Sequence, residues 1–196
     1  MSSGATRKAP FTFSTGIQAS AGARAETTAV VTPHFITTDE APRPDEPYWS
    51  SGGWKRGHLS RTEGPSPRVS SYAALDTIVA RLSDPARFPD MQEIVVAGHS
   101  AGGQVAHRYA AGGMEPRGVP IRYVVANPST FLFLGAERPD GAGGWSVPAP
   151  GACTDYREWH YGLENLNTYM RRLPGGTIEA NLVGRDVAIL LGDADT

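Results

Sequence analysis

Residues 93–111 read EIVVAGHSAGGQVAHRYAA, and the pattern of the chain changes sharply in the middle of this stretch. Its first part, 93–98, is a continuous apolar run with β-branched residues, which is typical of a strand buried on both faces of a parallel sheet. Its second part, 101–111, is rich in small residues and is followed by Gly112, which favours a helix that ends there. We therefore expect a strand that passes into a helix with almost no loop between them.

The rest of the chain repeats this alternation. Apolar, β-branched runs predict further strands at residues 28–36, 121–126 and 186–191. Behind the N-cap residue Ser70, apolar residues at three- and four-residue spacing predict an amphipathic helix that ends near Asp84. Another helix is expected at 163–173. Strands that alternate with helices indicate βαβ crossovers, so the predicted fold class is α/β, with a mainly parallel sheet and flanking helices.

Length and composition limit the kinds of protein that this chain can be. Its 196 residues amount to one domain, and 40 % hydrophobic with 19 % charged residues is an ordinary globular composition. The net charge of −2 offers no basic field to a nucleic acid, and no apolar run reaches the ~18 residues of a membrane-spanning helix. We expect a small-molecule substrate as the partner, no nucleic acid and no membrane span. The single cysteine, Cys153, fits a cytoplasmic location.

Glycine and proline, with 23 and 16 residues, indicate where regular structure is interrupted. Residues 39–68 are expected to form a long loop, and residues 129–183 a cap or excursion that covers the site. Residues 1–28 are rich in Gly, Ser, Thr and Ala and are expected to be disordered or poorly structured. A transit peptide and a mis-assigned start are the alternative interpretations of that segment. The predicted domain is 29–196.

The junction between the first strand and its helix carries the chemistry. Gly98-His99-Ser100-Ala101-Gly102 has the pattern G-x-S-x-G. A serine on a sharp strand-to-helix turn takes a strained backbone conformation, and glycines two residues before and after it relieve crowding. Such a turn exposes the Ser100 hydroxyl above the carboxyl edge of the sheet, where open α/β sheets place their ligands. The N–H of Ala101, at the positive end of the helix, is the candidate oxyanion donor.

This stretch resembles the α/β-hydrolase superfamily, and more narrowly its microbial members with a GHSAGG turn. The segments Tyr48-Trp49, Ala126-Asn-Pro-Ser129 and Trp159-His-Tyr-Gly162 support the resemblance, which covers about residues 29 to 196. The resemblance implies a serine hydrolase that acts on an ester, thioester or amide carbonyl through Ser100. It also implies the chain order serine, acid, histidine. The acid then belongs to a Gly-x-x-Asp turn after a later strand, which makes Asp195 the first candidate and Asp193 the alternative.

No histidine follows Asp195, which departs from the family order. Of the five histidines, His160 is the substitute base to consider first, while His34, His58, His99 and His107 are expected to be structural or exposed. The loop that gives the second oxyanion donor is not recognisable before residue 30 either. We therefore expect an incomplete α/β-hydrolase domain, truncated with respect to its family. The alternative hypothesis is a non-catalytic remnant or binding module that keeps the hydrolase sheet.

The remaining residues do not predict another chemistry. No cofactor is expected, because residues 98–103 lack the lysine of a phosphate loop, and no metal is expected, because no His, Cys or acidic residues have ligand spacing. Cys153 has no activating neighbour in the sequence and is expected to be inert. The aromatic residues of the loops allow either a ring-binding pocket or simple packing under the loops: Tyr48, Trp49, Trp54, Trp145, Trp159 and Tyr161.

Overall fold

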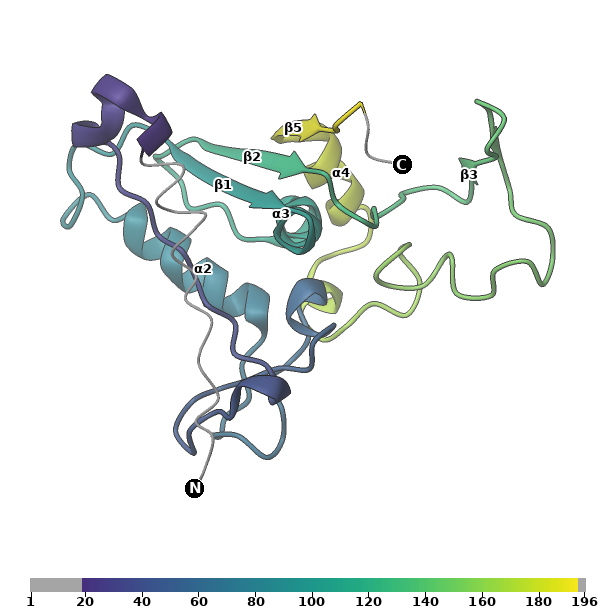
Figure 1. Ribbon diagram of the computed structural model, residues 1–196, viewed down its shortest axis with the longest axis horizontal. Helices are drawn as coiled ribbons and strands as arrows, with labels where there is room; N and C mark the ends of the chain where they lie inside the picture. The colour runs from purple at the N-terminus through teal and green to yellow at the C-terminus, as the bar shows by residue number, and fades with distance from the viewer. Residues whose placement is uncertain (1–18, 194–196) are drawn as a thin grey trace.

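The computed structural model of the protein describes residues 19–193 (Figure 1). The α-helices that lie wholly within these residues are α2 (Ser71–Leu82), α3 (Ala101–Gly112) and α4 (Thr177–Gly184). Its strands are β1 (Ile94–His99), β2 (Ile121–Ala126), β3 (Arg138–Pro139), β4 (Trp145–Ser146) and β5 (Asp186–Leu190). Four 3-10 helices complete the elements, namely η1 (Gly22–Thr27), η2 (Thr38–Glu40), η3 (Trp54–Arg56) and η4 (Met170–Arg172).

A three-stranded parallel sheet is the centre of the fold. Its strand order is β1-β2-β5, and both β1 and β5 run parallel to β2. Gly98 pairs with Val125, which in turn pairs with Ile189, so the three strands end together at one edge. The predicted class, α/β with a mainly parallel sheet and flanking helices, is confirmed. Strands β3 and β4 form a separate antiparallel pair that lies away from this sheet in Figure 1.

Local sequence explains both long helices. The Ser70 side chain caps α2 by accepting a hydrogen bond from the N–H of Tyr72 at 3.1 Å, and the apolar stripe behind it faces the core. Helix α3 begins directly after Ser100 and ends where Gly113 turns the chain into an extended conformation. Both helices lie where the sequence predicts them, because caps and apolar spacing act over only a few residues.

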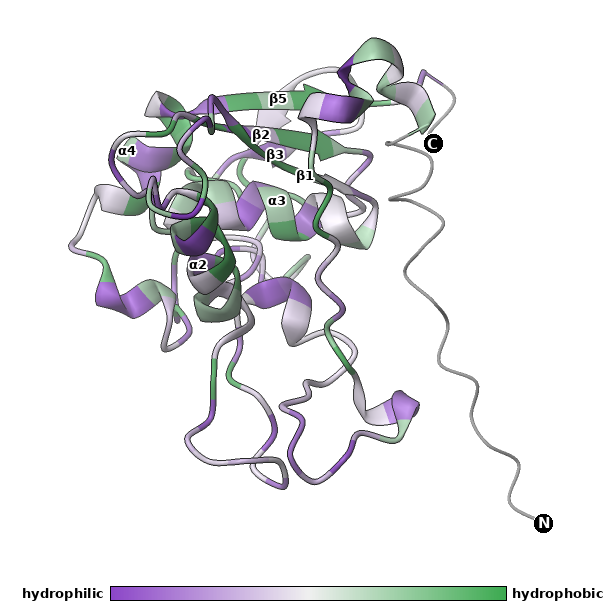
Figure 2. Ribbon diagram, turned by 90° about the vertical axis from the view of Figure 1, so that its left-hand side faces the viewer, coloured by the Kyte–Doolittle hydropathy of each residue, from purple (hydrophilic) through white to green (hydrophobic). Residues whose placement is uncertain are grey.

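The hydrophobic core fills one side of the sheet. Helices α2, α3 and α4 all lie on that side (Figure 1), and the strands above them are strongly hydrophobic (Figure 2). Tyr72, Tyr109 and Tyr123 are fully buried in this core. On the opposite face Val95 is 50 % exposed and Leu190 54 %. The expectation that the first strand is buried on both faces is therefore wrong for residues 93–98, since no helix of the described chain covers the second face.

Two predicted elements are wrong. Residues 28–36 form no strand, and only Thr37 makes an isolated bridge, to Trp49. Pro33 interrupts that run and has no N–H to donate to a neighbouring strand. The helix expected at 163–173 is reduced to the 3-10 turn η4, and the helix of this region is α4, further along the chain.

The prediction for the N-terminal segment falls partly outside the described residues. Of the N-terminal segment 1–28, residues 1–18 lie outside the described part, and residues 22–27 form η1, none of whose residues is buried. Between the N-terminal segment and α2 the chain forms η2, η3 and turns.

None of the helices within 19–193 is long and apolar enough to cross a membrane.

Candidate functional site

The backbone of Ser100 has the strained conformation that the motif predicts. Its φ is 54° and its ψ is −114°, a combination that few residues other than glycine adopt. Two backbone hydrogen bonds hold the turn: the N–H of Ser100 donates to the carbonyl of Ala126 at 2.9 Å, and the N–H of Gln104 donates to the carbonyl of Ser100 at 3.0 Å. Ser100 is exposed. The turn therefore presents a serine at the carboxyl edge of the sheet.

Gly98 and Gly103 make this turn possible. A Cβ on Gly98 would lie 2.1 Å from the carbonyl oxygen of Gly102, and a Cβ on Gly103 would lie 2.6 Å from the carbonyl oxygen of Ala126. Both contacts are with backbone atoms, which cannot move away as a flexible side chain can. At Gly102 itself a Cβ would meet nothing within 4 Å. Of the two motif glycines only Gly98 is sterically required, and Gly103, outside the motif, replaces Gly102 in that role.

The start of α3 supplies the expected electrostatic setting. Ala101 is the first residue of the helix, so its N–H has no carbonyl acceptor one turn earlier within the helix. The helix dipole adds partial positive charge at the same point. Among the described residues, no side chain hydrogen-bonds the Ser100 hydroxyl. The site thus has an exposed hydroxyl beside an N–H that is free to bind a developing negative charge.

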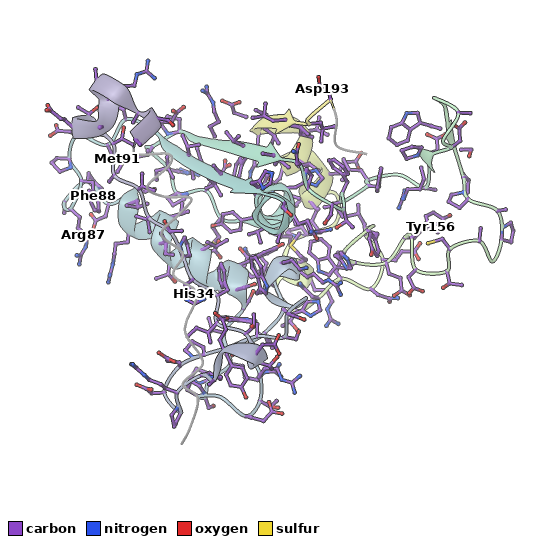
Figure 3. The ribbon with its side chains drawn as sticks, viewed as in Figure 1. His34, Arg87, Phe88, Met91, Tyr156 and Asp193 are labelled. Carbon is purple, nitrogen blue, oxygen red and sulfur yellow. The ribbon has the colours of Figure 1, made fainter. Side chains whose placement is uncertain are left out.

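The turn after β5 lies at the same edge as Ser100. Asn127, the residue after β2, binds this turn: its N–H donates to the carbonyl of Leu190 at 2.9 Å, and its side-chain oxygen accepts from the N–H of Gly192 at 2.8 Å. Asp193 follows directly and lies just beyond the end of β5 (Figure 3). Asp195, the first candidate for the acid, lies outside the described residues. Asp193 therefore follows β5 and Ser100 follows β1, at the same edge of the sheet, with β2 between the two strands.

Asn127 is a residue of this edge that the sequence pattern did not single out as part of the site. Its φ of 40° is in the left-handed region, which asparagine tolerates better than most residues. A signal was present, because an asparagine directly after a central strand and before a proline is typical of a turn. What the sequence could not reveal is that this turn holds the turn after β5.

A partly buried polar network fixes the segment after Asn127. The side-chain nitrogen of Gln104 donates to the Ser129 hydroxyl at 2.7 Å, and Gln104 Oε1 accepts from the Thr130 hydroxyl at 2.9 Å. Arg108, one turn further along α3, also donates to Thr130 Oγ1, at 2.7 Å. Helix α3 thereby holds the chain on one flank of the serine turn.

None of the described histidines makes a side-chain hydrogen bond to Ser100. His107 is buried, its Nδ1 accepts from the N–H of Leu132 at 3.3 Å, and burial together with Arg108 lowers its pKa to about 4. His160 is also buried, and its pKa is lowered to about 3 by burial and by nearby cations. Neither histidine is placed as a partner of the serine.

The other three histidines do not serve the serine either. His34 binds Glu40 at 2.7 Å and lies far from Asp193 in Figure 3. Burial and Arg56 lower the pKa of His58, which lies beside η3. His99 is exposed on β1.

The aromatic residues of the loops do not form one pocket. Trp49 is buried against Phe35, with ring centroids 5.5 Å apart, and Trp54 stacks on Phe35 at 5.6 Å. Trp159 donates to the carbonyl of Arg56 at 2.9 Å, whereas Trp145 is 61 % exposed. For Trp49, Trp54 and Trp159 the packing interpretation is confirmed.

Two other kinds of site can be assessed over residues 19–193. No three His, Cys, Asp or Glu side chains in that range could hold a metal ion together. An open depression of about 450 Å³ is lined by Leu163, Asn165, Leu166 and Arg171, and Ser100 does not contribute to it. The serine turn is the better candidate for a functional site, because a strained backbone is concentrated at such sites, whereas an open surface depression is not a mark of function.

Comparisons with models of protein families, with curated proteins and with solved structures found no match to this chain.

Proposed function

We propose that this chain carries the nucleophile of a serine hydrolase of the α/β-hydrolase type. The observation that supports the proposal most is the backbone of Ser100, with φ 54° and ψ −114° between a parallel strand and a helix. A serine in a relaxed turn would need no such conformation, and strain of this kind accumulates at functional sites. The order along the chain, serine first and acid candidates after a later strand, is that of α/β-hydrolases.

The proposed reaction is acyl transfer. The Ser100 oxygen forms a bond to the carbonyl carbon of an ester, thioester or amide, and the carbonyl oxygen takes up negative charge beside the N–H of Ala101. When the tetrahedral intermediate collapses, the bond to the leaving group breaks. The serine proton passes to a base and from there to the leaving group, and water then releases the acyl group by the same steps. Asp195, with Asp193 as the alternative, orients the base.

The base in this proposal is a histidine that these 196 residues do not supply. His107 accepts a hydrogen bond from the N–H of Leu132, His34 pairs with Glu40, and His160 is buried and makes no hydrogen bond to Ser100. This observation also favours a second candidate function, a non-catalytic binding module that retains the sheet and the serine turn. The two functions differ in one measurable property, the reactivity of Ser100.

Covalent labelling and turnover distinguish the two functions. The chain is treated with a fluorophosphonate probe and, separately, assayed on p-nitrophenyl acetate and butyrate, with Ser100→Ala in parallel. If Ser100 is the nucleophile, labelling is lost in Ser100→Ala. Added imidazole, acting as a substitute base, should raise the hydrolysis rate of the parent chain above that of Ser100→Ala at every imidazole concentration.

The comparison with Ser100→Ala removes the background, because imidazole hydrolyses such esters by itself. Equal labelling of both chains would overturn the assignment of Ser100 as nucleophile. Absence of labelling together with absence of any imidazole-dependent difference would favour the binding module. A serine-dependent rate without imidazole would point to a substitute base, and His160→Gln is then the first variant to measure.

A further inference from the structure

Five basic residues come from three chain segments that contact one another beside α3, and four of them act electrostatically on the fifth, His160. We call them the basic cluster: Lys55, Arg56, His58, Arg108 and His160. Trp159 Nε1 donates to the carbonyl of Arg56 at 2.9 Å, and Arg108 Nε donates to the carbonyl of His160 at 3.0 Å. The Tyr72 hydroxyl donates to the carbonyl of Lys55 at 2.9 Å. These bonds fix η3, α3 and the loop around His160 against one another.

Arg108 gives the cluster a buried charge that no carboxylate balances. Its side chain is 0 % exposed. Its nitrogens donate only to neutral oxygens, those of His160, Gln104 and Thr130. A guanidinium keeps its charge when buried, and neutral partners satisfy its hydrogen bonds without cancelling that charge. The interior beside α3 is therefore positive.

His160 lies beside this buried charge, since Arg108 donates to its backbone carbonyl. It is 6 % exposed and its ring lies on that of Tyr161, with centroids 4.1 Å apart. Its ring nitrogens make no hydrogen bond within residues 19–193, although an imidazole offers a donor and an acceptor. The charged groups that act on this ring are Arg108, Arg56, His58 and Lys55, and none of them is a carboxylate.

The outer members of the cluster are also without partners. The side chains of Lys55, Arg56 and His58 are half-buried, and none makes a hydrogen bond or ion pair to another described residue. Two carboxylates of the neighbouring loop are engaged elsewhere: Glu158 accepts from Asn165 at 3.0 Å, and Glu164 pairs with Arg157 at 2.7 Å.

We propose that the basic cluster is a binding site for a small oxyanion, either a carboxylate or a phosphate group. Arg56, His58 and His160 come from two segments that the bond from Trp159 to Arg56 holds together, and charge-assisted hydrogen bonds to an anion would use their unpartnered donors. An anion would also compensate the buried charge of Arg108, which the protein leaves uncompensated. Arg108 lies eight residues after Ser100, about 12 Å along the helix axis. The anion site is therefore separate from the serine turn and does not depend on the proposed hydrolase activity.

Titration with two simple anions tests the proposal. Imidazole resonances of His58 and His160 are followed by NMR while inorganic phosphate or acetate is added at constant ionic strength. We expect saturable shifts of both histidines with at least one anion. Saturation by phosphate alone would assign the site to phosphate groups, and saturation by acetate alone would assign it to carboxylates.

Matched charge removals locate the binding. Arg56→Gln is expected to lower the affinity for the anion about tenfold or more, because one charge-assisted contact is lost. Arg81→Gln removes the same charge from an exposed position on α2 and should leave the affinity unchanged. Lys55→Gln serves as a second variant if Arg56→Gln does not fold. Non-saturable shifts with both anions would overturn the proposal, and so would equal affinities of the parent chain and Arg56→Gln.

Discussion

At the scale of single residues, the serine turn depends on the absence of one side-chain carbon. A Cβ on Gly98 would lie 2.1 Å and 2.2 Å from the carbonyl oxygen and carbon of Gly102. We predict that Gly98→Ala lowers the free energy of unfolding by roughly 1 to 3 kcal/mol, the cost of overpacking a site that cannot relax. Urea denaturation monitored by circular dichroism measures the change.

Gly102→Ala is the matched control for that substitution. The added Cβ meets nothing within 4 Å and lies in the first turn of α3, where alanine is the better helix former. The free energy of unfolding of Gly102→Ala should be at least that of the parent chain, with a gain of up to about 1 kcal/mol. Equal losses in the two variants would show that crowding around the turn is not what requires Gly98.

A second prediction at the residue scale concerns acid stability. Burial and Arg108 lower the pKa of folded His107 to about 4, from the ordinary value of 6.5. Below pH 6.5 the unfolded chain binds a proton that the folded chain does not bind. The contribution of neutral, buried His107 to the free energy of unfolding is thus complete above pH 6.5 and is lost as the pH falls toward 4. At about 1.4 kcal/mol per pKa unit, this loss amounts to about 3 kcal/mol.

His107→Asn removes the titrating group and keeps an acceptor for the N–H of Leu132. The free energy of unfolding, measured from pH 7 to pH 4, should fall less steeply in this variant than in the parent chain. Some slope remains, because burial and cations also lower the pKa of His160. An unaltered slope in His107→Asn would contradict the prediction.

At the scale of elements, the turn after β5 is positioned by Asn127 rather than by its own sequence. Asn127→Gly keeps the left-handed backbone and removes the bond to the N–H of Gly192, whereas Asn127→Ala also introduces backbone strain. We predict faster amide hydrogen exchange at Gly192 in both variants, and a larger loss of stability in Asn127→Ala, by about 1 kcal/mol.

The amide of Ser100 provides an internal reference for that experiment. It donates to the carbonyl of Ala126, in the backbone of β2, and does not use the side chain of Asn127. Exchange at Ser100 should therefore stay slow in Asn127→Gly. If exchange at Gly192 also stayed slow, the hydrogen bond to Asn127 would not be what holds the turn.

Elements defined by local signals were predictable, and those defined by distant contacts were not. Helix α2 has its Ser70 cap and α3 has the glycines around the serine turn, so both were recognised with their starts correct and their ends within about two residues. Residues 28–36 have the composition of a strand, but the described chain gives them no neighbouring strand to pair with. Helix α4 has only a weakly amphipathic sequence. Its contacts with α3 include a hydrogen bond from Asn181 to the carbonyl of Ala111.

At the scale of the whole molecule, the described sheet has one apolar face that no described helix covers. Val95 and Leu190, on the two outer strands, lie on that face and are about half exposed. Exposed apolar patches bind hydrophobic dyes. We predict that Val95→Thr combined with Leu190→Thr lowers the fluorescence of bound anilinonaphthalene sulfonate and changes stability by about 0.5 kcal/mol or less.

Val183→Thr is the control for the sheet face. Val183 is 74 % exposed, but it lies on α4, on the other side of the sheet. Its substitution should leave dye binding nearly unchanged. If the double variant bound as much dye as the parent chain, the open face would not be the accessible apolar surface of the protein in solution.

The sequence by itself determined the α/β class, the two main helices and the serine turn. It could do so because caps, apolar spacing and crowded glycines are local, acting within one or two helical turns. Tertiary structure alone decided that Asn127 holds the turn before Asp193 and that three segments with five basic residues are held together beside α3. It alone decided as well that His107 and His160 are buried in the core. Each of these contacts joins residues far apart in the chain, and the free energy that favours it arises only when the core assembles.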